Sequence, residues 1–211
     1  MKKIKTALIS VSDKRNLKSL LDILKKNKIQ IISSGGTYKE IKKLKFKCLE
    51  VSKFTNFPEI LEGRIKTLHP KIHAGILNKR SNKKHLKELK QNKYENIDLV
   101  IVNFYPFEKT LTKTKNHKKI IENIDIGGPT LVRSAAKNYN DVTVVTSNNQ
   151  YLDLIKELDK NKGASSLEFR REMSELAFAE TASYDALISN YFNKDSNLHF
   201  PKKKNHMWKF N

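Results

Sequence analysis

Apolar residues along this chain fall into two alternating patterns. Short runs of consecutive aliphatic residues, typical of strands buried on both faces, alternate with stretches in which apolar residues recur every three or four positions, as on one face of a helix. The predicted strands cover residues 6–11, 29–33, 48–51, 97–103 and 142–146. The predicted helices cover residues 16–26, 38–44, 83–91, 129–137, 150–158 and, as one long final helix, 166–192.

This alternation of strands and helices predicts an α/β fold. We expect a doubly wound, mostly parallel sheet with helices on both faces. We also expect the long C-terminal helix to pack on the domain and on a partner. Residues 1–193 then form one domain. Residues 194–211 show no clear period and carry a cluster of lysines, so we expect a poorly ordered tail there.

The composition is that of a folded protein. Of 211 residues, 38% are hydrophobic and 30% are charged, and only 7 are glycine and 5 proline, which excludes collagen-like and low-complexity chains. The single cysteine, Cys48, cannot form an internal disulfide or a cysteine-based zinc cluster. No apolar run is long enough to span a membrane, and the first residues do not resemble a signal peptide. We therefore expect a cytoplasmic protein without a membrane partner.

The formal charge of +20 raises the question of nucleic-acid binding. Only 6 of the 42 basic residues are arginine, the residue that reads bases through bidentate contacts, and the lysines are spread over almost every predicted helix. A solvated, lysine-rich surface is the better interpretation, so we expect no nucleic-acid partner. The positive field still favours small anionic substrates.

A glycine pair follows the second predicted strand. In an open parallel sheet, ligands bind at the carboxyl ends of the strands. Gly35 and Gly36 allow backbone N–H groups to converge on an anion there, and Ser34 and Thr37 add hydroxyl donors. The segment is neither a Walker A loop nor a dinucleotide-binding G-x-G-x-x-G motif. A plain turn with a helix cap is the alternative.

Four other segments with polar chemistry follow predicted strands. They carry two hydroxyls and a lysine (residues 10–14), two cations with a glycine and a threonine (63–70), an amide and a phenol (103–107), and a carboxylate and a lysine (125–138). Each segment alone has an ordinary turn or cap as its alternative. Their coincidence on strands of one sheet favours a ligand site.

Two histidines test a metal-binding alternative. His69 and His73 are four residues apart, but Pro70 lies between them and no third ligand is near in the sequence. We therefore expect no metal. The Arg170-Arg171 pair lies at the start of the last helix, and we expect it to face solvent or a subunit partner.

The polar segments resemble those of a known family, in the family's order. The matching segments are SVSDK (10–14), SGGT (34–37), GRIKTLHPKIHAGIL (63–77), NFYPF (103–107) and DIGG (125–128). Over about residues 5–193 the chain resembles the IMP cyclohydrolase domain of the bifunctional purine biosynthesis protein. The resemblance implies a methylglyoxal-synthase-like fold. It also implies closure of 5-formamidoimidazole-4-carboxamide ribotide to inosine monophosphate with loss of water, without a cofactor or metal.

The resemblance implies roles for individual residues. The implied substrate-binding residues are Ser12, Asp13, Lys14, Ser34, Gly35, Gly36, Thr37, Arg64, Ile65, Lys66 and Thr67 around the phosphate, and Asn103, Phe104, Asp125, Ile126 and Gly127 around the base. The implied catalytic group consists of Lys137 as general acid/base, Tyr105 and Asp125 assisting it, Lys66 stabilising negative charge, and Asn103. Lys137 reaches the base only if its helix lies across the floor of the pocket.

The fold also serves two other functions, methylglyoxal synthase and a nucleotide-sensing module of carbamoyl phosphate synthetase. Residues 64–67, 103–107 and 125–137 favour the cyclohydrolase, because they offer acid/base groups and a base-sized pocket. Full-length members continue into a transformylase domain. We find no such sequence after Phe192, so we expect no transformylase activity here and consider a separate AICAR transformylase polypeptide as a partner. The family's habit of dimerising implies a homodimer.

Overall fold

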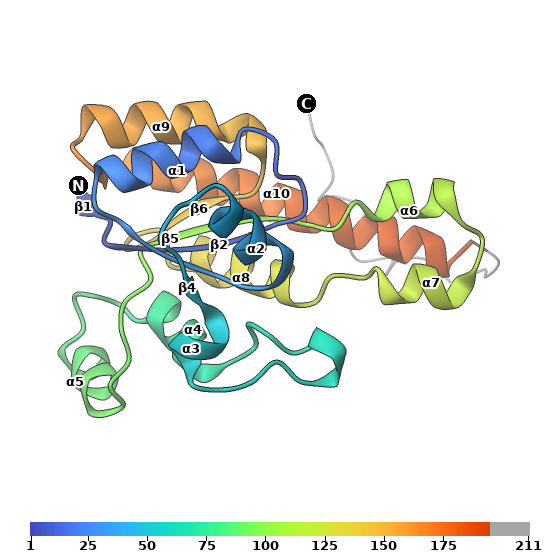
Figure 1. Ribbon diagram of the computed structural model, residues 1–211, viewed down its shortest axis with the longest axis horizontal. Helices are drawn as coiled ribbons and strands as arrows, with labels where there is room; N and C mark the ends of the chain where they lie inside the picture. Colours follow the sequence, from blue (N-terminus) through green and yellow to red (C-terminus); the bar gives the residue numbers. More distant parts are fainter. Residues whose placement is uncertain (195–211) are drawn as a thin grey trace, which may run out of the picture.

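The computed structural model describes residues 1–194, so residues 195–211 of the predicted tail lie outside the described residues. Five strands form one parallel sheet, shown in Figure 1. In their order across the sheet they are β4 (Leu49–Glu50), β3 (Gln30–Ser33), β2 (Thr6–Val11), β5 (Leu99–Asn103) and β6 (Thr143–Val145). The predicted α/β fold with a parallel sheet is confirmed.

Successive residues of the central strands enter two different cores. Ala7 and Ile9 of β2 pack with the helices on one face of the sheet, whereas Leu8 between them packs on the other face. The first face is covered by α1 (Leu17–Lys26) and α9 (Tyr151–Lys160). The second face is covered by α4 (Pro70–Leu77), α8 (Gly127–Lys137) and α10 (Leu167–Phe192). Helices on both faces, and the long C-terminal helix, are thus confirmed.

Several short elements were not predicted. A second sheet pairs β1 (Lys2–Lys3) antiparallel with β7 (Ala164–Ser165). The stretch predicted as a long loop after the third strand contains α3 (Val51–Thr55), a 3₁₀ turn η1 (Leu61–Gly63) and α4. In α4, Pro70 occupies the first turn and the His69 side chain caps the helix by accepting from Lys71 N at 3.1 Å. Proline therefore starts this helix rather than interrupting it.

Two helices begin at glycines that the sequence analysis placed in loops. Helix α2 (Gly35–Lys43) begins three residues before its predicted start, and α8 begins two residues before Pro129. Glycine is unfavourable inside a helix, but the N–H groups of the first turn need no partner within the helix. Both glycine pairs therefore present their backbone N–H groups at a helix N-terminus, while α5 (Lys83–Gln91) lies where it was predicted.

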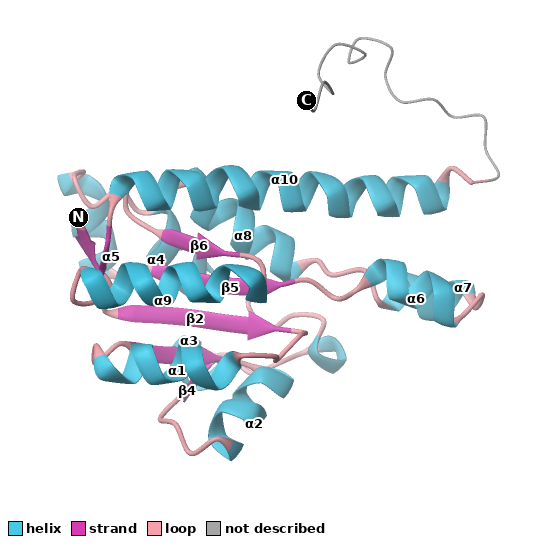
Figure 2. Cartoon of the chain, turned by 90° about the horizontal axis from the view of Figure 1, so that it is seen from above, coloured by secondary structure: helices cyan, strands magenta, loops and turns pink. Residues whose placement is uncertain are grey.

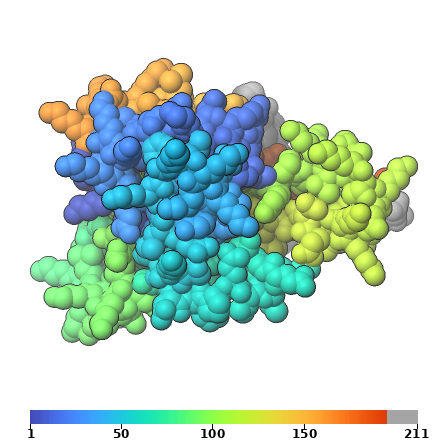
Figure 3. Space-filling view, viewed as in Figure 1, coloured from blue at the N-terminus to red at the C-terminus, as the bar shows by residue number. Residues whose placement is uncertain are grey.

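An arm extends from the body of the domain. It consists of α6 (Phe107–Lys113) and α7 (His117–Glu122), which lie beside the last turns of α10 beyond the end of the sheet (Figures 1 and 2). The Tyr191 ring of α10 contacts the rings of Phe107 and His117. In the space-filling view the arm is a yellow-green lobe beside the cyan segment near residue 60 (Figure 3). Within residues 1–194 no helix combines the length and apolar character needed to cross a membrane.

The expectation that Arg170 faces solvent or a subunit partner is wrong, because this residue is only 2% exposed. Its guanidinium donates to the carbonyl oxygens of Tyr139 (2.7 Å), Asn140 (3.1 Å) and Ser165 (2.6 Å). It therefore ties the start of α10 to the loop between α8 and β6. Arg171 is exposed as expected and pairs with Glu175 at 3.2 Å.

These two neighbours give a matched test of stability. Arg170→Met should lower the free energy of unfolding by about 2 to 4 kcal/mol, because three carbonyl groups lose a charged donor. Arg171→Ala should change it by less than about 0.5 kcal/mol, since it removes only an exposed ion pair. Urea unfolding of both variants measures the difference, and equal effects would contradict the anchoring role of Arg170.

Candidate functional site

Two lysines gather at the N-terminus of α2, at the carboxyl edge of the sheet. Gly35 has φ +53°, and a Cβ atom placed on it would lie 3.2 Å from Lys66 Nζ. A Cβ atom on Gly36 would lie 4.0 Å from Lys14 Nζ. Ser34, the N-cap residue, is buried and makes no capping bond with its side chain. Free helix N–H groups together with two ammonium groups make a good phosphate site.

The Thr37 side chain binds the backbone at the end of β2. Its hydroxyl accepts from Val11 N at 3.0 Å and donates to Val11 O at 2.9 Å. The side chain predicted to bind substrate is therefore used to hold α2 against the end of β2. Only the backbone N–H of Thr37 remains for an anion.

Residues Lys66 and Thr67 connect two sides of the site. The Lys66 ammonium lies beside the Gly35 turn and 3.7 Å from Glu59 Oε2. Thr67 is buried, and its Oγ1 would lie 3.0 Å from a Cβ atom on Gly127. The dipeptide thus spans from the N-terminus of α2 to the N-terminus of α8.

Asp125 provides a half-buried carboxylate at the start of α8. Its Oδ1 accepts from Gly128 N at 2.8 Å, and its own N–H donates to Tyr184 OH at 2.9 Å. Burial raises the pKa of this carboxyl group, although the backbone N–H groups of Gly128 and Tyr105 favour its charged form. Tyr105 reaches the carboxylate through its backbone N–H, and its side chain is 53% exposed. The side chain of Ile126, the next residue after Asp125, is 60% exposed. A carboxylate in this setting is suited to accept a proton.

The loop after β2 is held by Asn103, the last residue of β5. Its Oδ1 accepts from Ser12 N (2.6 Å) and Asp13 N (2.9 Å), and its Nδ2 donates to Asp13 O (3.0 Å). The Asp13 carboxylate contacts Arg15 at 2.5 Å, and the hydrogen bonds from Arg15 lower the pKa of Asp13 to about 2. Asn103 and Asp13 therefore organise the loop that carries Lys14.

The side chains of three other predicted site residues have partners outside this group. Arg64 is exposed, and its guanidinium is bound by the carboxylate of Glu122 in α7. Phe104 is 9% exposed and its ring lies 4.9 Å from the ring of Tyr184, inside the core. Ile65 pairs with Ile60 in an isolated β-bridge.

Lys137 lies apart from the predicted site residues at the N-termini of α2 and α8. It is the last residue of α8 and is exposed, and within residues 1–194 its side chain makes no hydrogen bond or ion pair. Helix α8 leads from the site to the opposite edge of the sheet, because β6 follows it and begins at Thr143, beside the start of β5. From Gly127 to Lys137 the helix is about 15 Å long. Helix α8 therefore carries Lys137 away from the site rather than across it.

Several contacting residues were missed by the sequence analysis. Glu59 and Glu122 bind the two predicted cations, and Tyr184 holds the backbone of Asp125. Asn148, in the 3₁₀ turn η2 (Asn148–Gln150) after β6, donates to Asp13 Oδ2 at 3.0 Å. Tyr184 was visible only as part of the apolar pattern of the last helix, and the other three carried no signal.

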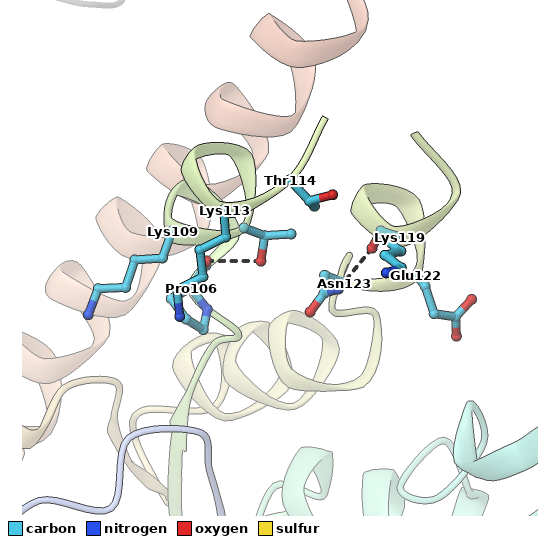
Figure 4. Close-up of a pocket in the computed structure, with 8 residues that line it drawn as sticks. Pro106, Lys109, Lys113, Thr114, Lys119, Glu122 and Asn123 are labelled. Carbon is cyan, nitrogen blue, oxygen red and sulfur yellow. Dashed lines mark hydrogen bonds between the residues drawn. The ribbon is translucent and has the colours of Figure 1, made fainter. Parts of the chain in front are cut away.

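A cavity of about 440 Å³ lies in the arm between α6 and α7 (Figure 4). Its lining includes Lys109, Lys113 and Lys119, and contains none of the predicted site residues. Pro106, the residue after Tyr105, is one of the residues that line the cavity. Its lysines add positive charge near the site, which favours the approach of anions.

The two histidines considered as metal ligands have other partners. His69 caps α4, and His73 Nδ1 lies 3.1 Å from Ser134 Oγ of α8. Burial lowers the pKa of His73. In the described part of the chain, no three His, Cys, Asp or Glu residues are grouped closely enough to hold a metal ion.

Comparisons with known proteins match this geometry to a family. The MGS-like domain model matches residues 16–130, and the model of the AICARFT/IMPCHase bienzyme matches residues 135–210. The crystal structure of ForH has a TM-score of 0.80 and 29% sequence identity, and the match covers 90% of this chain and 99% of that one.

Curated relatives carry the name bifunctional purine biosynthesis protein PurH. The protein from Bradyrhizobium diazoefficiens is 45% identical over 200 residues, which are 95% of this chain and 38% of the relative. The protein from Prochlorococcus marinus is 50% identical over 193 residues, which are 91% of this chain and 37% of the relative. The chain therefore spans less than half the length of these relatives.

Because the Asp125 carboxyl group is half-buried, we expect its replacement by a neutral amide to stabilise the protein in a pH-dependent way. Its folded-state pKa lies above the unfolded value, so the ionised form destabilises the fold once the pH exceeds both values. Asp125→Asn keeps the acceptor oxygen without the charge, and should raise Tm by about 2 to 4 °C near neutral pH. The gain should shrink as the pH falls and the parent carboxyl protonates. Thermal melts across the pH range test this; exposed Asp153→Asn should show no such gain.

Proposed function

This chain belongs to the MGS-like domain family, and we propose that it is an IMP cyclohydrolase acting in purine nucleotide biosynthesis. Its substrate would be 5-formamidoimidazole-4-carboxamide ribotide and its products inosine monophosphate and water. The match of residues 135–210 to the AICARFT/IMPCHase bienzyme supports this proposal, as do PurH relatives at 45% and 50% identity.

The observation that carries the proposal is the position of Lys66 and Thr67. Lys66 lies at the phosphate-binding turn of α2, and the next residue lies against the start of α8, where Asp125 is half-buried. A ligand whose phosphate binds at Gly35 and Gly36 would therefore extend its other end toward a carboxylate. This arrangement suits a nucleotide with a reactive base.

The reaction requires two N–H protons to be removed and the formyl oxygen to gain two protons. The carboxamide nitrogen attacks the formyl carbon, a C–N bond forms, the carboxamide loses one proton, and the formyl oxygen is protonated to a hydroxyl. The C–O bond then breaks as this hydroxyl takes a second proton and leaves as water, while the formamide nitrogen loses its proton and a C=N bond forms. We assign the removal of the carboxamide proton to Asp125 and the delivery of a proton to the oxygen to Tyr105. Lys66 stabilises negative charge, and fixing the phosphate selects the reactive conformer.

The role of Lys137 stays a prediction. As general acid/base it would have to reach the base, whereas α8 carries it to the other edge of the sheet. In a single chain we therefore favour Asp125 and Tyr105 for proton transfer. A role for Lys137 would require a site formed with a second chain.

We also propose a homodimer. Leu176 and Phe178 on α10 and Phe192 at its end are exposed apolar side chains, which a second copy would cover. Nucleotide sensing, one alternative function of the fold, would leave the Asp125 carboxylate without a task. Triose-phosphate chemistry would also use a base, and against it stand the match to the AICARFT/IMPCHase bienzyme and the PurH relatives. The AICAR transformylase partner also stays a proposal.

The proposed activity has a direct test. Purified protein incubated with the formamido ribotide should produce the absorbance change of purine formation, without added metal or cofactor. Lys66→Ala should weaken inosine monophosphate binding about tenfold or more and slow ring closure, because a charged donor to the nucleotide is lost. Folded protein without turnover would overturn the proposal, and unchanged affinity in Lys66→Ala would remove Lys66 from the site.

Variants of Asp125 and Lys137 test which of the two residues transfers the proton. Asp125→Asn should lower turnover about 10²- to 10⁴-fold while inosine monophosphate affinity changes little. Lys137→Ala should keep turnover within about threefold of the parent, since its side chain lies at the far edge of the sheet. Single-turnover rates measured beside product affinity separate the two. A large fall for Lys137→Ala would return the acid/base role to it.

A further inference from the structure

We infer that Asn148 is a positioning residue for the phosphate site at the start of α2, acting through Asp13. It lies in the turn after β6, a segment that contributes no residue to the predicted site. The inference rests on the proposed function, because it assigns the glycines and lysines at the start of α2 to the phosphate of the nucleotide.

The first step is the contact between Asn148 and Asp13. Asn148 Nδ2 donates to Asp13 Oδ2 at 3.0 Å across 135 residues of sequence. The same carboxylate accepts from Arg15 N (3.0 Å) and Arg15 Nε (2.8 Å to Oδ2). Both carboxylate oxygens are thus occupied. Asp13 is in the substrate-binding loop, yet its charge is held by protein donors, which keeps it from repelling a bound phosphate.

The second step is the coupling of Asp13 to the cations. Asn103 binds the backbone of Ser12 and Asp13 with three hydrogen bonds, so it fixes one side of the loop. Asn148 fixes the side chain of Asp13 on the other side. Between these two anchors, Lys14 Nζ lies 3.4 Å from Ser12 O and faces the Gly36 turn. Without Asn148 the Asp13 carboxylate would be held only by Arg15, whose side chain is 76% exposed, so the carboxylate and the Lys14 ammonium would each sample more positions.

The third step is the rigidity of the turn that presents Asn148. Gln150 Oε1 accepts from Thr146 N (2.8 Å) and Ser147 N (3.1 Å), and Ser147 and Gln150 form a capping box. Tyr151, the next residue, begins α9 and is buried in the core. The donor is therefore held in place before any ligand binds, as preorganisation of a site requires.

Asn148→Ala tests this role, with Asn149→Ala as the matched control. Asn149 is the exposed neighbour on the same turn, and its side chain makes no hydrogen bond with any residue from 1 to 194. Asn148→Ala should raise KM and the Kd for inosine monophosphate about three- to tenfold and keep kcat within about twofold. Asn149→Ala should change neither constant. Inhibition by inorganic phosphate should weaken in parallel with nucleotide binding in Asn148→Ala.

A double-mutant cycle identifies the route of the effect. In an Asp13→Ala background, Asn148→Ala should weaken binding by less than about twofold further, because the group it acts through is gone. Should Asn148→Ala fail to fold, Asn148→Asp has the same shape and places a second carboxylate against Asp13, so it should weaken binding more.

The outcomes separate this inference from the proposed function. A folded parent that neither binds inosine monophosphate nor closes the ring defeats the proposed function. A competent parent whose Asn148→Ala variant binds as tightly as Asn149→Ala overturns the role of Asn148. Equal losses in the parent and Asp13→Ala backgrounds, or a fall in kcat and Tm without a change in Kd, overturn it as well.

Discussion

The candidate site depends on how the central pair of parallel strands ends. Strands β2 and β5 stay paired up to Val11 and Asn103, and beyond that point the backbone has no further strand to bind. The side chains of Thr37 and Asn103 take over: one binds both backbone groups of Val11, and the other binds the N–H groups of the next two residues. Buried backbone groups need partners, so these side chains fix the start of α2 and the loop that carries Lys14.

Charge is distributed unequally over the two halves of the site. Lys14 and Lys66 lie at the N-terminus of α2, whose dipole has the same sign, so this half is stable only with an anion or with counter-charges such as Glu59. In the other half, Asp125 is removed from water, which makes its ionised form costly. Both features weaken the free protein locally and suit a ligand with a phosphate at one end and a proton to lose at the other.

The long helix α10 supports the second half of the site. Ser174 Oγ donates to Ala136 O of α8 at 2.9 Å, Arg170 binds the loop after α8, and Tyr184 OH accepts from Asp125 N. Helix α8 is therefore held by α10 at both ends, at Asp125 just before its N-terminus and at Ala136 and the loop after its C-terminus. Its N-terminus is fixed at the site and its C-terminus at the opposite edge of the sheet, which explains why Lys137 lies apart from Asp125.

The sequence by itself determined the five parallel strands, the main helices and the polar segments at their carboxyl ends, because hydrophobic periodicity and glycine placement are local properties. Only the tertiary structure decided what those polar side chains bind. Thr37, Asn103 and Asp13 carry ligand-like chemistry but bind backbone and Arg15. Asn148 and buried Arg170 gave no local signal of their partners. The physical reason is that a hydrogen-bonding side chain satisfies whichever partner the fold places within about 3 Å, and that distance is set by packing between elements far apart in the chain.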